Sequence, residues 1–180
     1  MIRAAAPVPT SSSCPSTTVR RLGPPDWRDL RSARLAALGD APDAFVATPA
    51  DEDARTRQGW IDSIRLTVWA GAWVDGQIVG IARLTAAELS EPTRPFVESV
   101  WVAPEYRGRG LVQDMLRVLE VAARRKGATH LQLWVLETNH RASAAYLSLD
   151  FVEVPARAQD SKKLSDDDTP VQEHLMVRPV

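Results

Sequence analysis

Two glycines alternate with two arginines at Arg107-Gly108-Arg109-Gly110, between an apolar strand pattern that ends at Val102 and a helical pattern that follows. The first turn of a helix leaves backbone N–H groups unpaired and carries the positive end of the helix dipole. Glycine lets an anion approach the backbone closely, and the two arginines add charge that can reach a second phosphate. The stretch therefore predicts a phosphate-binding corner.

Three phosphate motifs compete for this stretch. The dinucleotide-binding fingerprint requires a third glycine where Gln113 stands. The P-loop requires Gly-Lys followed by Ser or Thr after four spacer residues, and this is absent. The pattern that remains is Arg/Gln-x-x-Gly-x-Gly/Ala, which residues 107–112 follow apart from the last position.

The elements around this corner follow from periodicity and turn residues. Alternating or wholly apolar runs predict strands, and apolar residues at helical spacing predict helices. Asp75-Gly76 predicts a hairpin turn, and residues 96–136 predict a strand–helix–strand unit with a right-handed crossover. Strands are expected at 18–22, 67–74, 77–85, 96–102, 131–136, 151–154 and 173–178, helices at 24–38, 54–65, 109–125 and 140–149, and loops at 43–53 and 159–169, the second of them mobile.

Composition limits the class of protein. The chain has 180 residues, a net charge of −1 and 44% hydrophobic residues, as one soluble domain would. The charge argues against nucleic acid as the main partner. Cys14 is the single cysteine, which rules out an intramolecular disulfide and a cysteine zinc cluster and fits a reducing compartment. Residues 1–17 are expected to be a disordered tail and 18–180 one domain.

No apolar segment is long enough to span a bilayer, and the N-terminal stretch is not a convincing signal peptide. We therefore expect a cytoplasmic protein without a membrane partner and without a metal.

Residues 107–112, which follow Val102-Ala103-Pro104-Glu105-Tyr106, resemble the acetyl-CoA pyrophosphate loop of the GNAT N-acetyltransferase superfamily. Residues 131–151, LQLWVLETNHRASAAYLSLDF, resemble the second signature of that family: a strand, an Asn, a short helix ending in Tyr, and then Gly-Phe. The expected strand order from Thr18 to Arg178 also matches. Each signature alone is a weak indication of the family. Together, in the usual order and at the usual separation, the two signatures are a strong indication.

The resemblance implies an α/β fold with a central mixed, mostly antiparallel twisted sheet, about four helices and a βαβ unit for the cofactor. It implies transfer of an acetyl group from acetyl-CoA to a primary amine of a small molecule or peptide, by direct attack on the thioester. Members of the family are often homodimers, so a homodimer is allowed. The residues expected to bind acetyl-CoA are Val100, Trp101, Val102, Arg107, Gly108, Arg109, Gly110, Leu111, Val112, Asn139, Ser143 and Tyr146.

Tyr146 is, by resemblance, the acid that protonates the departing thiolate, and a backbone N–H near Val102 can polarise the thioester carbonyl. The alternative for Tyr146 is a core aromatic, because Ala142, Ala145 and Leu149 share its side of the helix. Asn139 is an expected helix N-cap, and the family Asn at this place also contacts the cofactor.

Glu98 is the first candidate for the base, because strand alternation places it on the face of Val100 and Val102. A carboxylate there can hold the ammonium and relay its proton through water. A solvated strand glutamate is the alternative for Glu98, and Glu137 is the second candidate for the base.

Two residues depart from the family pattern. Val112 stands where Gly or Ala is usual, and its branched side chain would crowd a pyrophosphate. Asp150 stands where Gly usually precedes Phe151, at a position expected to be left-handed. These departures motivate a second hypothesis, a weak or inactive GNAT-fold module that binds CoA or another ligand.

Two tryptophans and two acidic runs outside the two signatures could contribute to the binding of the acceptor amine. Trp27 and Trp60 lie on the first two helices, which in the family often wall the acceptor pocket. The acidic runs 51–53 and 166–168 either attract a cationic amine or are solvated loops.

Overall fold

The computed structural model describes residues 15–45, 47–86, 93–164 and 170–180. Residues 1–14 of the tail predicted at 1–17 lie outside the described residues, as does the acidic run at 166–168, and Thr17 already belongs to β1. The elements are β1 Thr17–Arg21, α1 Trp27–Asp40, α2 Pro49–Asp53, α3 Arg57–Leu66, β2 Val68–Val74, β3 Gln77–Leu84, β4 Val97–Val102, α4 Leu111–Arg124, β5 His130–Leu136, α5 His140–Leu147, β6 Val152–Leu164 and β7 Pro170–Pro179. Single 3-10 turns occupy Pro24–Asp26, Pro42–Ala44 and Pro104–Tyr106.

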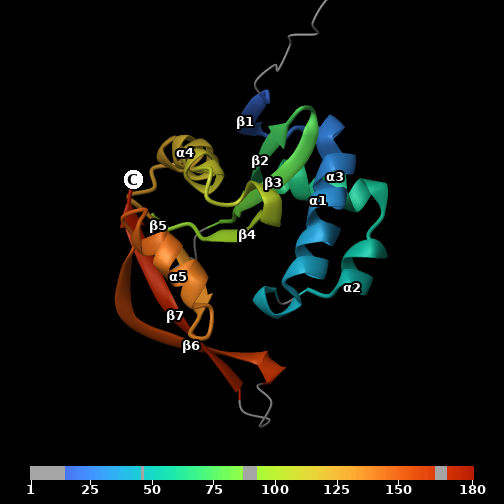
Figure 1. Cartoon of the computed structure of the whole chain (residues 1–180). Helices are drawn as coiled ribbons and strands as arrows, with labels where there is room; N and C mark the ends of the chain where they lie inside the picture. The colour runs from blue at the N-terminus through green and yellow to red at the C-terminus, as the bar shows by residue number, and fades with distance from the viewer. Residues whose placement is uncertain (1–14, 46, 87–92, 165–169) are drawn as a thin grey trace, which may run out of the picture.

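The first four strands form one antiparallel sheet in the order β1-β2-β3-β4, with helices on both faces. Figure 1 shows α4 on one face and α1 with α3 on the other. Two hydrophobic clusters fill these layers: Met115 and Leu119 of α4 belong to one, and Leu30 of α1 and Trp60 of α3 belong to the other. The apolar face of each helix therefore points to the sheet, as its spacing predicted.

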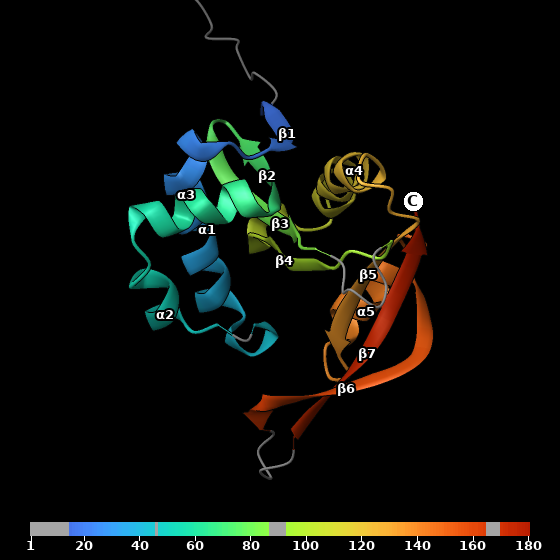
Figure 2. The same ribbon diagram turned by 180° about the vertical axis from the view of Figure 1, so that it is seen from behind.

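The last three strands form a second antiparallel sheet in the order β5-β7-β6. Among the described residues, β4 and β5 meet at one isolated parallel bridge, Phe96 to Gln132. The single mixed sheet that we expected is thus two antiparallel sheets that touch at one point and then diverge, as Figure 2 shows from behind. The α/β class and the β4–α4–β5 unit are confirmed.

The divergence begins at a β-bulge in β4. Ile81 pairs with Trp101, whereas Arg83 pairs with Glu98, so β4 carries one extra residue between these pairs. Ser99 lies at the bulge and has φ of +54°. A bulge bends its strand and disrupts the ladder locally, which leaves room between β4 and β5.

The bulge corrects one expectation about Glu98. Alternation predicted that Glu98 shares a face with Val100 and Val102, but the extra residue shifts the alternation. Val97, instead of Glu98, lies on the face of Val102, and both valines pack in the cluster that contains Met115 and Leu119 of α4, the α4-side cluster. Glu98 pairs with Arg83 on the other face.

Two predicted loops contain regular structure. Residues 43–53 include the one-turn helix α2, because Thr48 caps it by accepting from the backbone N–H of Asp51 (3.2 Å) and Glu52 is buried against Arg34. Its presence makes five described α-helices instead of about four. Part of the predicted loop at 159–169 belongs to β6, which pairs with β7 as far as Leu164. The second helix begins at Arg57 instead of Ala54, because Thr56 caps it.

Candidate active site

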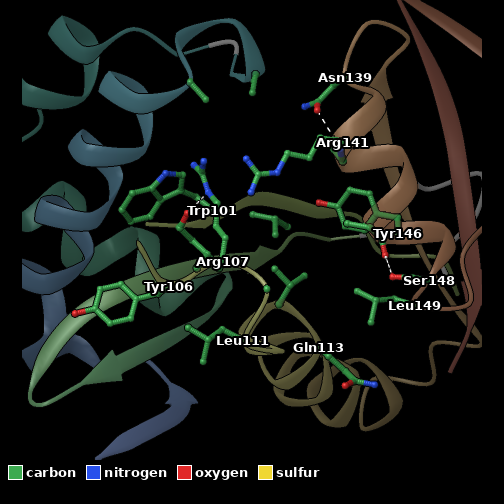
Figure 3. A pocket seen from close by; sticks show the side chains of 18 of the residues that line it. Trp101, Tyr106, Arg107, Leu111, Gln113, Asn139, Arg141, Tyr146, Ser148 and Leu149 are labelled. Atoms are coloured by element: carbon green, nitrogen blue, oxygen red, sulfur yellow. Dashed lines mark hydrogen bonds between the residues drawn. The ribbon is translucent and has the colours of Figure 1, made fainter. Parts of the chain in front are cut away.

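One cavity of about 590 Å³ lies between the end of β4, the start of α4 and the side of α5. Its volume is in the range of small-molecule binding sites. Figure 3 shows side chains from all three elements around it. Most of the predicted site residues line this cavity: Val100, Trp101, Val102, Arg107, Gly108, Gly110, Leu111, Val112, Asn139 and Tyr146. Two signatures that are distant in sequence therefore share one site.

The glycine corner has the backbone geometry that an anion requires. Gly108 and Gly110 both have positive φ, +74° and +77°. Gly110 is the N-cap of α4, which begins at Leu111. A Cβ added at either glycine would meet nothing within 4 Å, so the space above the first turn of α4 is open. The free N–H groups of that turn are accessible to a phosphate from the cavity.

The two arginines of the corner have different surroundings. Arg107 lines the cavity, donates from Nε to the carbonyl of Val102 (2.8 Å), and pairs with Asp40 at the end of α1. Arg109 lies outside the cavity lining; its guanidinium donates to the carbonyl of Glu105 (2.9 Å) and stacks over Tyr106. The structure therefore brings Arg107, and not Arg109, to the cavity.

The backbone N–H of Val102 points to the open side of β4. The next residue, Ala103, donates its N–H to the carbonyl of Val79 on β3 (2.8 Å). Neighbouring residues in an antiparallel ladder alternate the direction of their N–H groups, so that of Val102 points away from β3. The carbonyl of Val102 points the same way, because it accepts from Arg107. An N–H at the predicted polarising position is thus available beside the cavity.

Tyr146 extends from α5 with its hydroxyl directed into the cavity (Figure 3). Its ring packs edge-on against Phe151, with ring centroids 5.6 Å apart. Burial raises the pKa of the Tyr146 phenol above its ordinary value of 10.0, because the charged phenolate is poorly solvated there. Tyr146 therefore meets both expectations. Its ring packs as a core aromatic would, and its hydroxyl faces the cavity.

Asn139 and Ser143 lie on different sides of α5. Asn139 lines the cavity and caps the helix by accepting from the backbone N–H of Ala142 (3.1 Å), as predicted. Ser143 is outside the cavity lining. Its hydroxyl donates to the carbonyl of Asn139 (3.2 Å) and faces Nε2 of buried His174 on β7 (3.4 Å). The expected contact between Ser143 and a cofactor is therefore not supported by its position.

A second cavity, of about 120 Å³, occupies the gap between β4 and β5. It shares Phe45, Val100, Asn139 and Tyr146 with the larger cavity, so the two adjoin beside Tyr146. Glu98 lines this smaller cavity. The side chain of Glu98 is 42% exposed and is ion-paired with Arg83.

Other predicted acceptor residues lie elsewhere. Trp27 and Trp60 pack in the cluster under α1 and α3 and do not belong to the lining of either cavity. Glu137, the second candidate for the base, also lies outside both linings. Phe45, from the segment between α1 and α2, lines both cavities, as Tyr146 does.

The sequence alone did not single out three cavity residues. Asp40 accepts from Trp101 Nε1 (2.9 Å) and pairs with Arg107, but it belongs to no motif in the sequence. Phe45 carries no motif. Arg141 points from α5 into the cavity (Figure 3), and its proximity to Asn139 in the second signature was the available signal.

The two departures from the family pattern have clear positions. Val112, in the first turn of α4, lines the cavity and also packs against the α4-side cluster. Asp150 has φ of +64°, the left-handed conformation that we predicted for it. Backbone hydrogen bonds from Asp150 to Leu147 and from Phe151 to Tyr146 close the end of α5 around it (3.2 and 3.1 Å).

Among the described residues, no group of three or more His, Cys, Asp or Glu side chains is arranged to hold a metal ion. In the same part of the chain, no helix has the length and apolar character needed to cross a membrane.

A family model described as "Acetyltransferase (GNAT) family" matches residues 30–151, more than half of the chain. Thialysine N-epsilon-acetyltransferase from Bos taurus is 37% identical over 54 residues, which cover 30% of this chain and 32% of that protein. The match therefore spans about a third of the length of this relative.

Two solved structures share the architecture. The acetyltransferase of GNAT family from Streptococcus pneumoniae superposes with a TM-score of 0.75 at 18% identity, covering 92% of this chain and all (100%) of that chain. A putative acetyltransferase from Salmonella typhimurium, solved with acetyl-CoA, gives a TM-score of 0.71 at 19% identity, covering 91% and 94%. At these identities the likeness establishes the fold, which confirms the predicted GNAT-like architecture.

Proposed function

Because the chain belongs to the GNAT acetyltransferase family, we propose that it is an acetyl-CoA-dependent N-acetyltransferase that acts on a primary amine of a small molecule or peptide. One observation carries the proposal: a single cavity joins the open first turn of α4 to the hydroxyl of Tyr146. The bovine relative is named for acetylation at an N-epsilon position, which supports the choice of an amine.

The residues present fit acetyl-CoA, which supplies an activated acetyl thioester. Gly108 and Gly110 leave the space above the α4 N-terminus open, so that the N–H groups of the first turn can hold the pyrophosphate. Arg107 adds positive charge on the cavity wall. Val100, Val102 and Asn139 line the path from this corner to Tyr146, and we assign them to the thioester-bearing arm.

The reaction that we propose is direct transfer. The amine nitrogen forms a C–N bond to the acetyl carbon while the C–S bond breaks, and the thiolate takes the phenolic proton of Tyr146. The proton that the newly acylated nitrogen then loses restores the phenol. The phenol of Tyr146 is protonated at neutral pH, and because burial raises its pKa, donation to the thiolate depends on a hydrogen bond positioned between the two groups. The N–H of Val102, directed to the open side of β4, can stabilise negative charge that develops on the carbonyl oxygen.

The amine must also lose a proton, and we propose Glu98 as the acceptor of that proton through water. Glu98 lines the small cavity that adjoins the large one beside Tyr146. The ion pair with Arg83 fixes its carboxylate. Glu98→Gln should lower kcat and alter the pH–rate profile, and an unchanged profile would remove Glu98 as the base.

Thiol release from acetyl-CoA with a panel of primary amines tests the function, together with calorimetric titration of CoA. We expect saturable release with some amines and a large loss in Tyr146→Phe. Binding of CoA without release on any amine would favour a CoA-binding module without turnover, the alternative that Val112 and Asp150 suggest. Absence of CoA binding would contradict both.

We also propose a cytoplasmic location and a homodimer for this protein. A chain with one cysteine suits the reducing cytoplasm, where acetyl-CoA would be used. The homodimer is proposed because members of the family are often homodimers. Sedimentation velocity tests it through the mass of the protein in solution.

A further inference from the structure

Arg141 is a cavity residue whose charge has no partner in the described part of the chain. It lies in the first turn of α5 and lines the large cavity. Figure 3 shows its side chain extending across the cavity from α5 toward Trp101 and Arg107. No hydrogen bond, ion pair or ring contact joins its guanidinium to another described residue. Arg141 therefore presents its charge and its whole fork of N–H donors to a ligand in the cavity.

The other two charged side chains of the lining neutralise each other. Among the described lining residues, the charged ones are Asp40, Arg107 and Arg141. Arg107 pairs with Asp40 and donates from Nε to the carbonyl of Val102. Asp40 accepts in addition from Nε1 of Trp101 (2.9 Å), so its carboxylate is fully engaged. The positive charge that remains is that of Arg141, and it makes the lining attractive to an anionic group.

The position of Arg141 separates this charge from the corner proposed for the pyrophosphate. That corner is the first turn of α4, which also supplies Gln113 to the lining. In Figure 3, Arg141 and Gln113 lie on opposite sides of Tyr146. The segment that joins α1 to α2, which contributes Ala41 and Phe45 to the lining, lies on the side of Arg141. An anion bound by Arg141 therefore belongs to a molecule that meets the thioester from the side opposite the pyrophosphate, which is the acceptor.

One small molecule is long enough to contact both Arg141 and Tyr146. Both residues belong to α5, and Tyr146 lies about 7.5 Å beyond Arg141 along the helix axis at the usual rise per residue. Both side chains are directed into the cavity (Figure 3). The lining residues between them on α5 are Ala142 and Ala145, whose small side chains leave space. An amine can thus lie beside Tyr146 while an anionic group of the same molecule meets Arg141.

We propose that the acceptor is an amine that also carries a carboxylate, which is the chemistry of a free amino acid, and that Arg141 binds this carboxylate. The inference rests on the proposed function and narrows its substrate class. A guanidinium and a carboxylate match in a fork of parallel N–H···O hydrogen bonds, which orients the acceptor as well as holding it. Arg141 is a substrate-binding residue in this scheme and takes no part in proton transfer.

Matched pairs of acceptors test the preference with the wild-type protein. Each pair joins an amino acid to the amine that remains without its carboxylate: glycine and methylamine, β-alanine and ethylamine, leucine and isopentylamine, phenylalanine and phenethylamine. Thiol release from acetyl-CoA gives kcat/KM for each compound. In the most active pair, we expect the amino acid to exceed its amine by about tenfold or more, because the amine lacks the charge-assisted hydrogen bonds. Equal or faster release with that amine would overturn the inference and leave the proposed function intact.

Arg141→Gln tests the residue itself. We expect KM for the amino acid of the most active pair to rise about tenfold, while KM for its matched amine and the Kd of CoA stay unchanged. Arg141→Lys keeps the charge without the planar fork, so it should recover part of the loss. Arg124→Gln is the matched control, since Arg124 is an exposed arginine of α4 outside both cavity linings, and it should change none of these values.

The remaining outcomes are also decisive. An unchanged KM for the amino acid in Arg141→Gln would overturn the inference, and a raised Kd of CoA in that variant would assign Arg141 to the cofactor instead. If Arg141→Gln does not fold, the most active pair on the wild-type protein still decides the preference. If neither amino acids nor amines release thiol although CoA binds, the proposed function and this inference both fail.

Discussion

The ring of Tyr146 meets the ring of Phe151 edge-on, with centroids 5.6 Å apart. Phe151 is 1% exposed, and Arg178 of β7 also lies over its ring, 5.0 Å from the ring centroid. Arg178 also donates to the carbonyl of Leu149 (2.9 Å). The aromatic ring of Tyr146 thus packs against the core, and its hydroxyl is directed into the cavity.

Replacement of Tyr146 by Phe should separate chemistry from folding. The ring contact survives, so Tm should change by no more than about 2 °C. The proton donor is lost, so kcat should fall by about 10²-fold to 10³-fold while the Kd of CoA is unchanged. Thiol release, thermal denaturation and calorimetry measure these quantities. Undiminished kcat would show that another group protonates the thiolate.

The raised pKa of Tyr146 also predicts a dependence of stability on high pH. The folded pKa lies above the unfolded value of about 10. The protonated phenol therefore makes its full contribution to the free energy of unfolding below pH 10. This contribution is lost as the pH rises through the pKa that the phenol has in the folded protein. Tm measured between about pH 9 and pH 11.5 should fall more steeply in wild type than in Tyr146→Phe. Parallel curves would contradict a buried phenol.

Gly110→Ala should weaken CoA binding through the new methyl group. Its positive φ of +77° imposes strain on alanine, at a cost of about 1–2 kcal/mol. Gly127→Ala is the matched control, because Gly127 has φ of +79° and equally open surroundings but lies outside the cavity lining. We expect similar losses of Tm in both variants and weaker CoA binding, measured by calorimetry, in Gly110→Ala alone.

Val112→Ala tests whether this side chain restricts the cofactor. The variant opens the cavity wall at the first turn of α4, so we expect the Kd of CoA to fall by about threefold to tenfold. It also removes contacts with the α4-side cluster, at a stability cost of about 1 kcal/mol. Calorimetric titration and urea unfolding measure the two effects. Weaker binding would show that Val112 already fits its ligand.

The buried pair of Arg34 and Glu52 should support α2 and Phe45. Nε of Arg34 lies 3.1 Å from Oε1 of Glu52, and each side chain is 7% exposed. Arg34 also lies over the ring of Phe45, which lines both cavities. Glu52→Gln leaves a buried guanidinium without its counter-charge, so the free energy of unfolding in urea should fall by about 3–5 kcal/mol.

The control for this prediction is the exposed pair of Arg31 and Asp53, which joins the same two helices. Asp53→Asn should cost at most about 1 kcal/mol, because solvent screens such a pair. Equal losses in Glu52→Gln and Asp53→Asn would show that burial is not the cause.

Asp150→Gly should stabilise the protein. Asp150 holds φ of +64°, and glycine removes the strain of a side chain in the left-handed region, which is worth about 1 kcal/mol. We expect a rise in Tm with kcat within about twofold of wild type, since Asp150 lies outside both cavity linings. A large gain in kcat would instead show that this departure from the family pattern limits activity.

Local signals in the sequence predicted most of the elements and the phosphate corner. Asp75-Gly76 makes the expected hairpin turn between β2 and β3, and Gly110 starts α4 in the left-handed conformation. Asn139 caps α5. These features depend on residues a few positions apart, so periodicity and turn chemistry are sufficient to predict them.

Features that depend on distant contacts were missed. The bulge at Ser99 moved Glu98 to the other face, because the register of β4 is set by its partner β3. Arg109 stacks on Tyr106 while Arg107 pairs with Asp40, although both arginines appear equivalent in the sequence. Helix α2 depends on Glu52 reaching Arg34 on α1.

The sequence by itself therefore determined the GNAT-like fold and the residues of two signatures, because backbone preferences and motif spacing are local properties. Only the tertiary structure decided which of these residues share a cavity and which faces they occupy. The position of Tyr146 depends on Phe151 and Arg178. The gap that Glu98 lines depends on where β4 and β5 diverge. Packing between elements far apart in the chain sets both.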